Sequence, residues 1–257
     1  MRSGPDAYRT ILGIRFFQGS AASAVDQMEG GGVLVVPAAP ALKDLETDAA
    51  YRDALVHADL AITDSSFMVL AWNFLQKDTL RRLSGLEYLR ELLGRESARR
   101  PGNTLWVMAG RVSAERNLAW LGEQGIDVPA ECVYLAPMYG REMSDPKLVA
   151  LLEKLRPQHV IVAIGGGTQE RLGIYLKRTL SYRPAVHCIG AAIAFLSGDQ
   201  VRIPMWGDRL YMGWLFRAVS APSVYVPRYW GARKLFALMR KSRERLPGGD
   251  GVGAESR

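Results

Sequence analysis

The chain has 257 residues, 48% hydrophobic and 23% charged, which is an ordinary composition for a soluble globular protein with a sizeable core. It has no apolar run of 18 residues, which excludes a predicted membrane-spanning helix, and two cysteines are too few for a disulfide framework. Three separated histidines and no cysteine cluster argue against a zinc site, so we expect neither a metal nor a cofactor. The cysteine content and an N-terminus without an apolar signal region favour a cytoplasmic location.

Short apolar runs alternate with helix-type segments along the chain. Continuous apolar runs are typical of strands buried on both faces, and they occur at 32–37, 59–63, 104–110, 131–136, 159–165 and 185–190. The helix-type segments are 41–57, 65–76, 84–94, 112–124, 144–156 and 167–180, and Ser84, Ser113 and Asp145 are their expected N-caps. This alternation predicts an α/β, Rossmann-like core over residues 1–198, with a mostly parallel sheet and helices on both faces.

The net charge is confined to the C-terminal fifth of the chain. Residues 201–257 contain 11 Lys and Arg against 4 Asp and Glu, which equals the whole net charge of +7. Arginines mixed with amphipathic aromatic residues suit an anionic membrane surface or a phosphate-bearing ligand. We therefore predict a basic helical appendage over 199–246 and a Gly-rich disordered tail over 247–257. A solvated helix face is the plainer alternative, and apolar residues such as Leu210, Trp214 and Leu215 weakly favour a homo-oligomer.

Asp64 directly follows the predicted strand 59–63, so it has two interpretations. Its carboxylate could cap the following helix by accepting N–H groups of Ser66 or Phe67. It could instead act as a general base, because ligands of parallel α/β sheets bind outside the carboxyl ends of the strands. Position alone leaves both interpretations open.

A glycine-rich turn follows the strand at 159–165. Gly165, Gly166 and Gly167 precede a helix whose first residues include Gln169 and Glu170, and such a turn suits a diphosphate at a helix N-terminus. No Gly-Lys-Ser/Thr follows, so this is not a P-loop, and the G-x-G-x-x-G pattern is incomplete. A tight turn with Gln169 and Glu170 in a first helical turn is the structural alternative.

Other strand ends supply further candidates for ligand contacts. Gly110 and Arg111 follow the strand at 104–110, and Tyr139 lies after the strand at 131–136. Arg82 precedes a capped helix, where a guanidinium could pair with a phosphate or simply face solvent. Together with the turn at 165–170, these residues form the expected substrate-binding set.

The order of these pieces resembles the WecG/TagA/CpsF glycosyltransferases, a bacterial family that builds polysaccharides on lipid carriers. The resemblance covers about residues 10–220 and is carried by six segments in the same order, 53–72, 82–92, 107–121, 135–142, 164–173 and 202–222. Each segment alone is a weak signal, and their shared order makes the resemblance fairly specific.

The resemblance implies a metal-independent enzyme that transfers a sugar, often an N-acetylated aminosugar, with inversion. The donor would be a UDP-sugar and the acceptor a polyprenyl-diphosphate-linked saccharide. Asp64 matches the family's proposed base, and Arg82 and Gln169 match residues that line its site. Arg209 and Arg217 match arginines of an appendage that binds the lipid diphosphate on the inner face of the cell membrane.

Several positions depart from the family pattern. A Thr-x-Asn stretch is replaced by Pro37-Ala38-Ala39, a carboxylate is replaced by Ala194, and a lysine by Thr168. Lost hydrogen-bonding groups change what a sugar pocket can hold. One alternative is therefore a non-catalytic binding partner for a lipid-linked saccharide. A nucleic-acid-binding protein is a weaker alternative, because the core carries no net charge, so we expect no nucleic acid partner.

Overall fold

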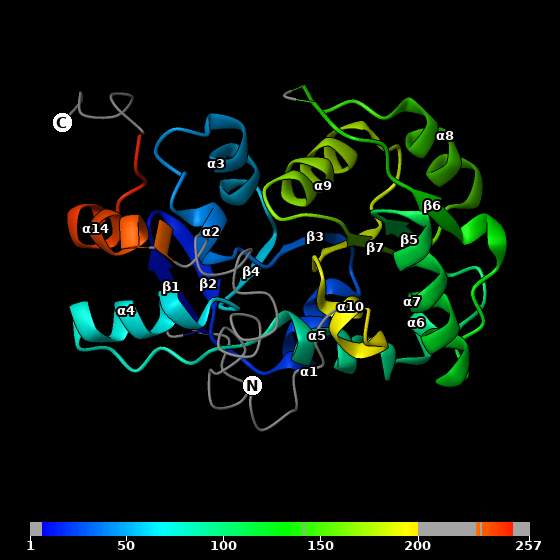
Figure 1. Ribbon diagram of the computed structural model, residues 1–257, viewed down its shortest axis with the longest axis horizontal. Coiled ribbons are helices and arrows are strands. Elements are labelled where there is room, and N and C mark those ends of the chain that lie inside the picture. The colour runs from blue at the N-terminus through cyan, green and yellow to red at the C-terminus, as the bar shows by residue number, and fades with distance from the viewer. Residues whose placement is uncertain (1–6, 141, 200–229, 232, 249–257) are drawn as a thin grey trace.

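The computed structural model describes residues 7–140, 142–199, 230–231 and 233–248. Its centre is an eight-stranded sheet with the order β1-β2-β4-β3-β8-β7-β5-β6 (Figure 1). Only the β1–β2 pair is antiparallel. The strands are β1 (Tyr8–Ile11), β2 (Ile14–Phe17), β3 (Gly32–Val35), β4 (Leu60–Ile62), β5 (Thr104–Met108), β6 (Val133–Leu135), β7 (His159–Ala163) and β8 (Ala185–Cys188).

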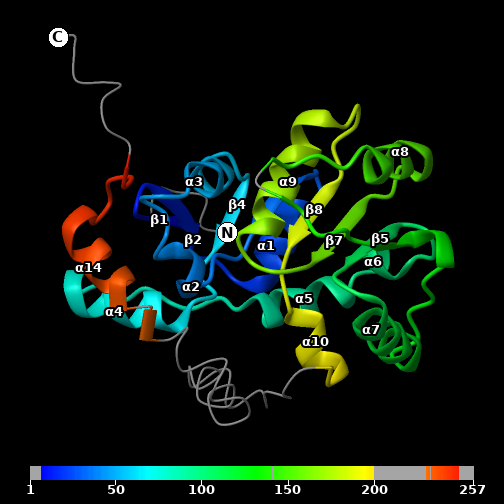
Figure 2. The ribbon, with the colours of Figure 1, turned by 45° about the horizontal axis from the view of Figure 1, so that its top comes forward.

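Helices cover both faces of this sheet (Figures 1 and 2). One face carries α2 (Ala39–Leu42), α3 (Ala49–Val56), α8 (Pro146–Leu155) and α9 (Thr168–Thr179). The other carries α1 (Ala21–Met28), α5 (Gly85–Leu93), α6 (Glu96–Arg99), α7 (Arg111–Glu123) and α10 (Ala192–Ser197), and a short 3-10 turn at Ala130–Cys132 leads into β6. Two further helices, α4 (Ser66–Gln76) and α14 (Arg233–Ser242), lie side by side at the β1 end.

Alternate residues of each central strand enter two separate hydrophobic cores. In β5, Leu105 and Val107 pack into one core, whereas Trp106 and Met108 pack into the other. All five β5 residues are buried, as expected for a parallel strand covered on both faces. The predicted α/β, Rossmann-like fold with helices on both faces is confirmed.

Two local predictions need correction, and some elements were not predicted. The hairpin of β1 and β2 was not predicted, nor were α1 and α10. The segment 41–57 was expected to be one helix, but it breaks, because Asp48 accepts the Tyr51 N–H at 2.9 Å and caps a new helix, α3. Ser113 was expected to cap α7, which instead begins after Gly110 and contains Ser113.

The β1–β2 hairpin is tied to the C-terminal end of the described chain. Its turn residues Leu12 and Gly13 have φ values of 53° and 76°. Leu12 donates its N–H to the Arg243 carbonyl at 2.7 Å, and Gly13 donates its N–H to the Glu244 carbonyl at 2.8 Å. A Cβ on Gly13 would lie 2.6 Å from Leu246 Cβ, so this turn requires glycine.

We predict that Gly13→Ala lowers the free energy of unfolding by about 1–3 kcal/mol, because it combines a left-handed backbone with this close contact. Urea denaturation measures the loss. Gly122→Ala is the matched control, since Gly122 lies in the last turn of α7 and no described atom outside the neighbouring backbone lies within 4 Å of its Cβ position. The free energy of unfolding of this variant should rise by about 0.5–1 kcal/mol. A Gly13→Ala variant as stable as the native protein would contradict the packing described.

Candidate functional site

The carboxyl ends of the parallel strands meet at one edge of the sheet, where the predicted site residues gather. Asp64 follows β4, Gly165 follows β7, and Gly190 follows β8. The start of α5 lies between them, because a Cβ on Gly85 would lie 3.8 Å from the Ile189 carbonyl oxygen. Contacts of Gly85 and Gly190 therefore link the region around Asp64 to the glycine-rich turn after β7.

Asp64 binds the segment before α5 rather than its own helix. Its Oδ1 accepts the Gly85 N–H at 2.9 Å and lies 3.4 Å from Arg82 Nη2. Arg82 Nε also donates to the Asp64 carbonyl at 2.5 Å. The cap of α4 is Ser65, whose side chain accepts the Met68 N–H at 3.2 Å. Of the two interpretations of Asp64 that the sequence left open, the one in which it caps α4 is therefore wrong.

Thr63 makes two further hydrogen bonds to the segment before α5. The sequence analysis did not identify Thr63 as a site residue. Its hydroxyl donates to the Arg81 carbonyl at 2.7 Å and accepts the Leu83 N–H at 3.1 Å. Thr63 is fully buried. A hydroxyl residue at the end of an apolar strand was the only signal that could have indicated this role.

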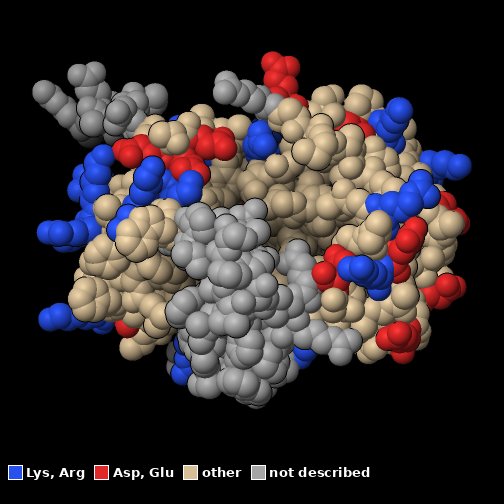
Figure 3. All heavy atoms as spheres, in the orientation of Figure 1, with Lys and Arg blue, Asp and Glu red and all other residues tan. Residues whose placement is uncertain are grey.

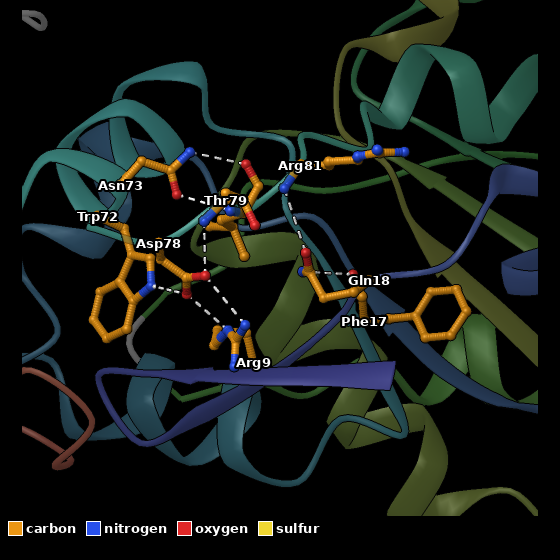
Figure 4. A network of polar contacts seen from close by, with 9 residues as sticks. Arg9, Phe17, Gln18, Trp72, Asn73, Asp78, Thr79 and Arg81 are labelled. Atoms are coloured by element: carbon orange, nitrogen blue, oxygen red, sulfur yellow. Dashed lines mark hydrogen bonds and ion pairs between the residues drawn. The ribbon is translucent and has the colours of Figure 1, made fainter. Parts of the chain in front are cut away.

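A polar network fixes the chain between α4 and Arg82 (Figure 4). Asp78 accepts from Trp72 Nε1 at 3.0 Å and pairs with Arg9 Nε at 2.8 Å, while Gln18 Oε1 accepts the Arg81 N–H at 3.4 Å. Burial alone would raise the pKa of Asp78, but the hydrogen bonds from Trp72 and Thr79 and the charge of Arg9 lower it. The network thus keeps Asp78 charged and holds the segment that carries Arg82.

Gln169 and Glu170 face the protein interior. Gln169 Oε1 accepts the Gly190 N–H at 2.6 Å, and its Nε2 donates to Glu170 Oε1 at 3.1 Å. Glu170 Oε2 accepts the Gly167 N–H at 2.6 Å, which closes the first turn of α9. Both side chains are buried. They therefore connect the turn after β7 to the turn after β8, and burial raises the pKa of Glu170 to about 7.

The glycines that were expected to bind a diphosphate border open space. Among the described residues, no atom lies within 4 Å of a Cβ built on Gly110, Gly165, Gly166 or Gly167. Gly167 has a φ of 87°, which favours glycine at this N-cap. The N–H groups of Gly167 and Gln169 are already bonded, to Glu170 and to the Gly165 carbonyl. A ligand at this turn would thus meet the remaining amides.

Tyr139 is held by Asp145. Its hydroxyl donates to Asp145 Oδ2 at 2.7 Å, and Tyr134 donates to the same carboxylate at 2.8 Å. Burial raises the pKa of Tyr139 well above its ordinary value, and that of Tyr134 to about 12. Tyr139 follows β6, five strand positions from β4, or about 24 Å at 4.8 Å per strand. It does not join the group around Asp64.

The start of α7 is fixed to the residues after α10. Ser113 donates to Asp199 at 2.5 Å, and Arg116 pairs with Asp199 at 3.0 Å. The side chain of Arg111 is exposed at the first position of α7, beside Gly110. The predicted appendage residues Arg209 and Arg217 lie outside the described residues, as do Leu210, Trp214 and Leu215.

The two histidines of the sheet form a buried chain on the α5 side. Tyr88 Oη lies 2.8 Å from His187 Nδ1, and His187 Nε2 lies 3.1 Å from His159 Nδ1. Burial lowers the pKa of both histidines, so both are neutral near pH 7. In the ranges that the structure describes, no group of three or more His, Cys, Asp or Glu side chains could hold a metal ion.

The raised pKa of Glu170 predicts a pH-dependent stability. The unfolded carboxyl loses its proton near pH 4.5 and the folded one near 7, so the folded state binds the extra proton between these values. The free energy of unfolding should therefore fall as pH rises from about 4.5 to 7, by up to about 3 kcal/mol from this group.

Urea denaturation of Glu170→Gln across this pH window tests the effect. The variant stays neutral, so its stability should fall less steeply than that of the native protein. Glu115→Gln, which removes an exposed carboxylate from α7, is the control. Parallel stability curves for native protein and Glu170→Gln would contradict the assignment.

The sequence of the chain matches one family of known proteins. A comparison with protein families matches residues 9–248 to the glycosyl transferase WecG/TagA/CpsF family. A comparison with curated proteins gives no match. The family match spans nearly the whole chain, from the second residue of β1 to the end of the described C-terminal region. The chain therefore belongs to the WecG/TagA/CpsF glycosyltransferases, a family that acts in cell-surface polysaccharide synthesis.

Proposed function

We propose that this glycosyltransferase moves a sugar from a UDP-sugar to a polyprenyl-diphosphate-linked saccharide, with inversion and with Asp64 as general base. The acceptor oxygen attacks the anomeric carbon while Asp64 takes the proton of the acceptor hydroxyl. The bond from the anomeric carbon to the diphosphate oxygen breaks, and its electron pair leaves with the UDP. Asp64 ends the step protonated and returns its proton to solvent.

The exposure of Asp64 carries this assignment. Asp64, Asp145 and Glu170 come directly after β4, β6 and β7 or at the start of the next helix and accept backbone N–H groups, but Glu170 is only 1% exposed and Asp145 only 4%. The Asp64 side chain is 27% exposed. Its Oδ1 is occupied by Gly85 and Arg82, which fixes the carboxylate and leaves room for a substrate hydroxyl. Of the three, Asp64 suits a base best.

Arg82 supports Asp64 more directly than it could support a phosphate. Its side chain is 9% exposed, and it binds both the carbonyl and the carboxylate of Asp64. In the proposed reaction, Arg82 positions the base. Arg209 and Arg217 remain the proposed partners of the diphosphate, within an appendage over residues 199–246 that would attach peripherally to an anionic membrane.

The open space along the glycines supports a nucleotide site at the same carboxyl edge, three and four strand positions from β4. The turn at 165–167 follows β7, and Gly110 follows β5, its neighbour in the sheet. Small residues let backbone amides approach a diphosphate closely. We place the UDP along these two strand ends. Gln169 and Glu170 would hold the turn in place from its buried side.

We predict that Asp64→Asn lowers kcat by 10²–10⁴-fold with little change in KM for the donor, because general bases contribute on this scale. The asparagine oxygen can still accept the Gly85 N–H, so the fold should persist. Transfer of radiolabelled sugar from a panel of UDP-sugars to polyprenyl-diphosphate-linked acceptors measures turnover. Asp127→Asn, at the opposite end of α7 from Gly110, is the control for loss of an exposed carboxylate.

Full turnover by Asp64→Asn would contradict its role as the base. A native protein that is stabilised by UDP in thermal unfolding but transfers no sugar would instead support the non-catalytic binding partner. That alternative is favoured by the side chains at the end of β3 and in α10, since Ala39 and Ala194 are buried and offer no polar group.

A further inference from the structure

Helix α4 is apolar on two opposite sides. Its eleven residues, SFMVLAWNFLQ, include no charged side chain. Met68, Val69 and Trp72 are buried in the core. Phe67, Leu70 and Phe74 point away from it and are 37%, 54% and 77% exposed. Because these three residues are spaced by three and four positions, they form one continuous face, the α4 stripe. A stripe that the described residues leave exposed to this extent indicates a partner.

Positive charge flanks the α4 stripe. Helix α14 packs against α4, with the rings of Phe74 and Phe236 6.4 Å apart. The residues Arg233, Lys234 and Arg240 of α14 are exposed, and so is Lys77 at the end of α4. Figure 3 shows Lys and Arg side chains gathered at this end of the molecule, next to an uncharged area. Apolar side chains beside cations match the chemistry of an anionic lipid surface.

We propose that the α4 stripe inserts into the interfacial region of an anionic bilayer while the cations of α14 bind lipid headgroups. Among the described helices, none is both long enough and apolar enough to cross a bilayer, so the contact would be interfacial. This inference deepens the proposed function, because it adds α4, a helix of the core domain, to the membrane contact proposed for residues 199–246, which include α14.

A second copy of the chain fits this surface less well. The three stripe residues expose roughly 300 Å² if an aromatic side chain offers about 200 Å², which is below the about 800 Å² per partner of a standard interface. A symmetric pairing through α4 would also bring the cations of two α14 helices toward each other. An anionic surface removes both difficulties.

Docking through α4 has a consequence for the candidate site. The helix begins two residues after Asp64, and its length is about 16 Å. A bilayer contact along α4 therefore brings the carboxyl edge of the sheet close to the lipid surface. This consequence rests on the proposed function, in which the acceptor saccharide is attached to a membrane lipid.

Vesicle flotation without any substrate tests the docking itself. The full-length protein should bind phosphatidylglycerol–phosphatidylcholine vesicles. The double substitution Leu70→Ser with Phe74→Ser should weaken binding at least ten-fold. Val112→Ser, which removes an apolar side chain that is 62% exposed on α7, is the matched control and should bind as the native protein does. Unchanged thermal unfolding would verify that the stripe variant is folded.

The cations are tested separately by Lys234→Gln with Arg240→Gln. This pair should lose about ten-fold in binding to anionic vesicles and nothing in binding to phosphatidylcholine vesicles. Lys147→Gln with Lys154→Gln, two exposed cations of α8, is the control. Native binding by the stripe variant would overturn the proposal, as would a native dimer that the stripe variant converts to a monomer.

A transfer assay separates this inference from the proposed function. The stripe variant should keep native turnover with a short-chain, water-soluble acceptor and lose turnover with a long-chain acceptor embedded in vesicles. If no acceptor is used by the native protein, the proposed function fails, while flotation still decides whether α4 docks. Equal loss of turnover with both acceptors would overturn the membrane role of the stripe.

Discussion

The joint between the end of β4 and the segment before α5 sets the geometry of the carboxyl edge. Thr63 and Asp64 together bind Arg81, Arg82, Leu83 and Gly85. The Thr63 hydroxyl is buried, so its removal would leave a carbonyl and an N–H without partners, which costs about 1–3 kcal/mol for each group. The same bonds that hold α5 against the sheet therefore also fix the Asp64 carboxylate. In the proposed reaction, an Asp64 base held in this way would need little reorganisation before the acceptor attacks.

The sequence predicted the central strands because each is buried on both faces and reads as a continuous apolar run. The β1–β2 hairpin was not predicted, because its strands do not form continuous apolar runs. Its strands have four residues each, and the exposed Arg9 and Arg15 interrupt the apolar pattern at the edge of the sheet. Its stability depends on Arg243 and Glu244, more than 200 positions away. No local pattern can show a contact of that range.

The candidate site was predicted as a set of residues but not as a set of contacts. Asp64 and Arg82 were both expected at the site, yet their direct pairing needs a fold that joins positions 18 apart. The N-cap of α4 is Ser65 rather than Asp64, and the sequence does not fix the start of a helix to within one residue. Gln169 and Glu170 were expected to face a ligand. The sequence does not show whether a polar side chain after a glycine-rich turn points outward or inward. The structure turns both inward, where they bind each other.

The end of β3 constrains which sugar the proposed reaction could use. β3 lies between β4 and β8, so the residues after it occupy the middle of the edge, between Asp64 and Gly190. Here the chain places Pro37 and Ala39, and neither side chain can donate or accept a hydrogen bond. Both side chains are buried, so a sugar hydroxyl at the middle of the edge would find no side-chain hydrogen-bond partner in this segment, which disfavours its burial there. The sugar must then be recognised by backbone groups or present its less polar side to β3. Within the proposed function, Asp64 at the position of the base and the apolar residues after β3 together favour a change of donor over a loss of activity.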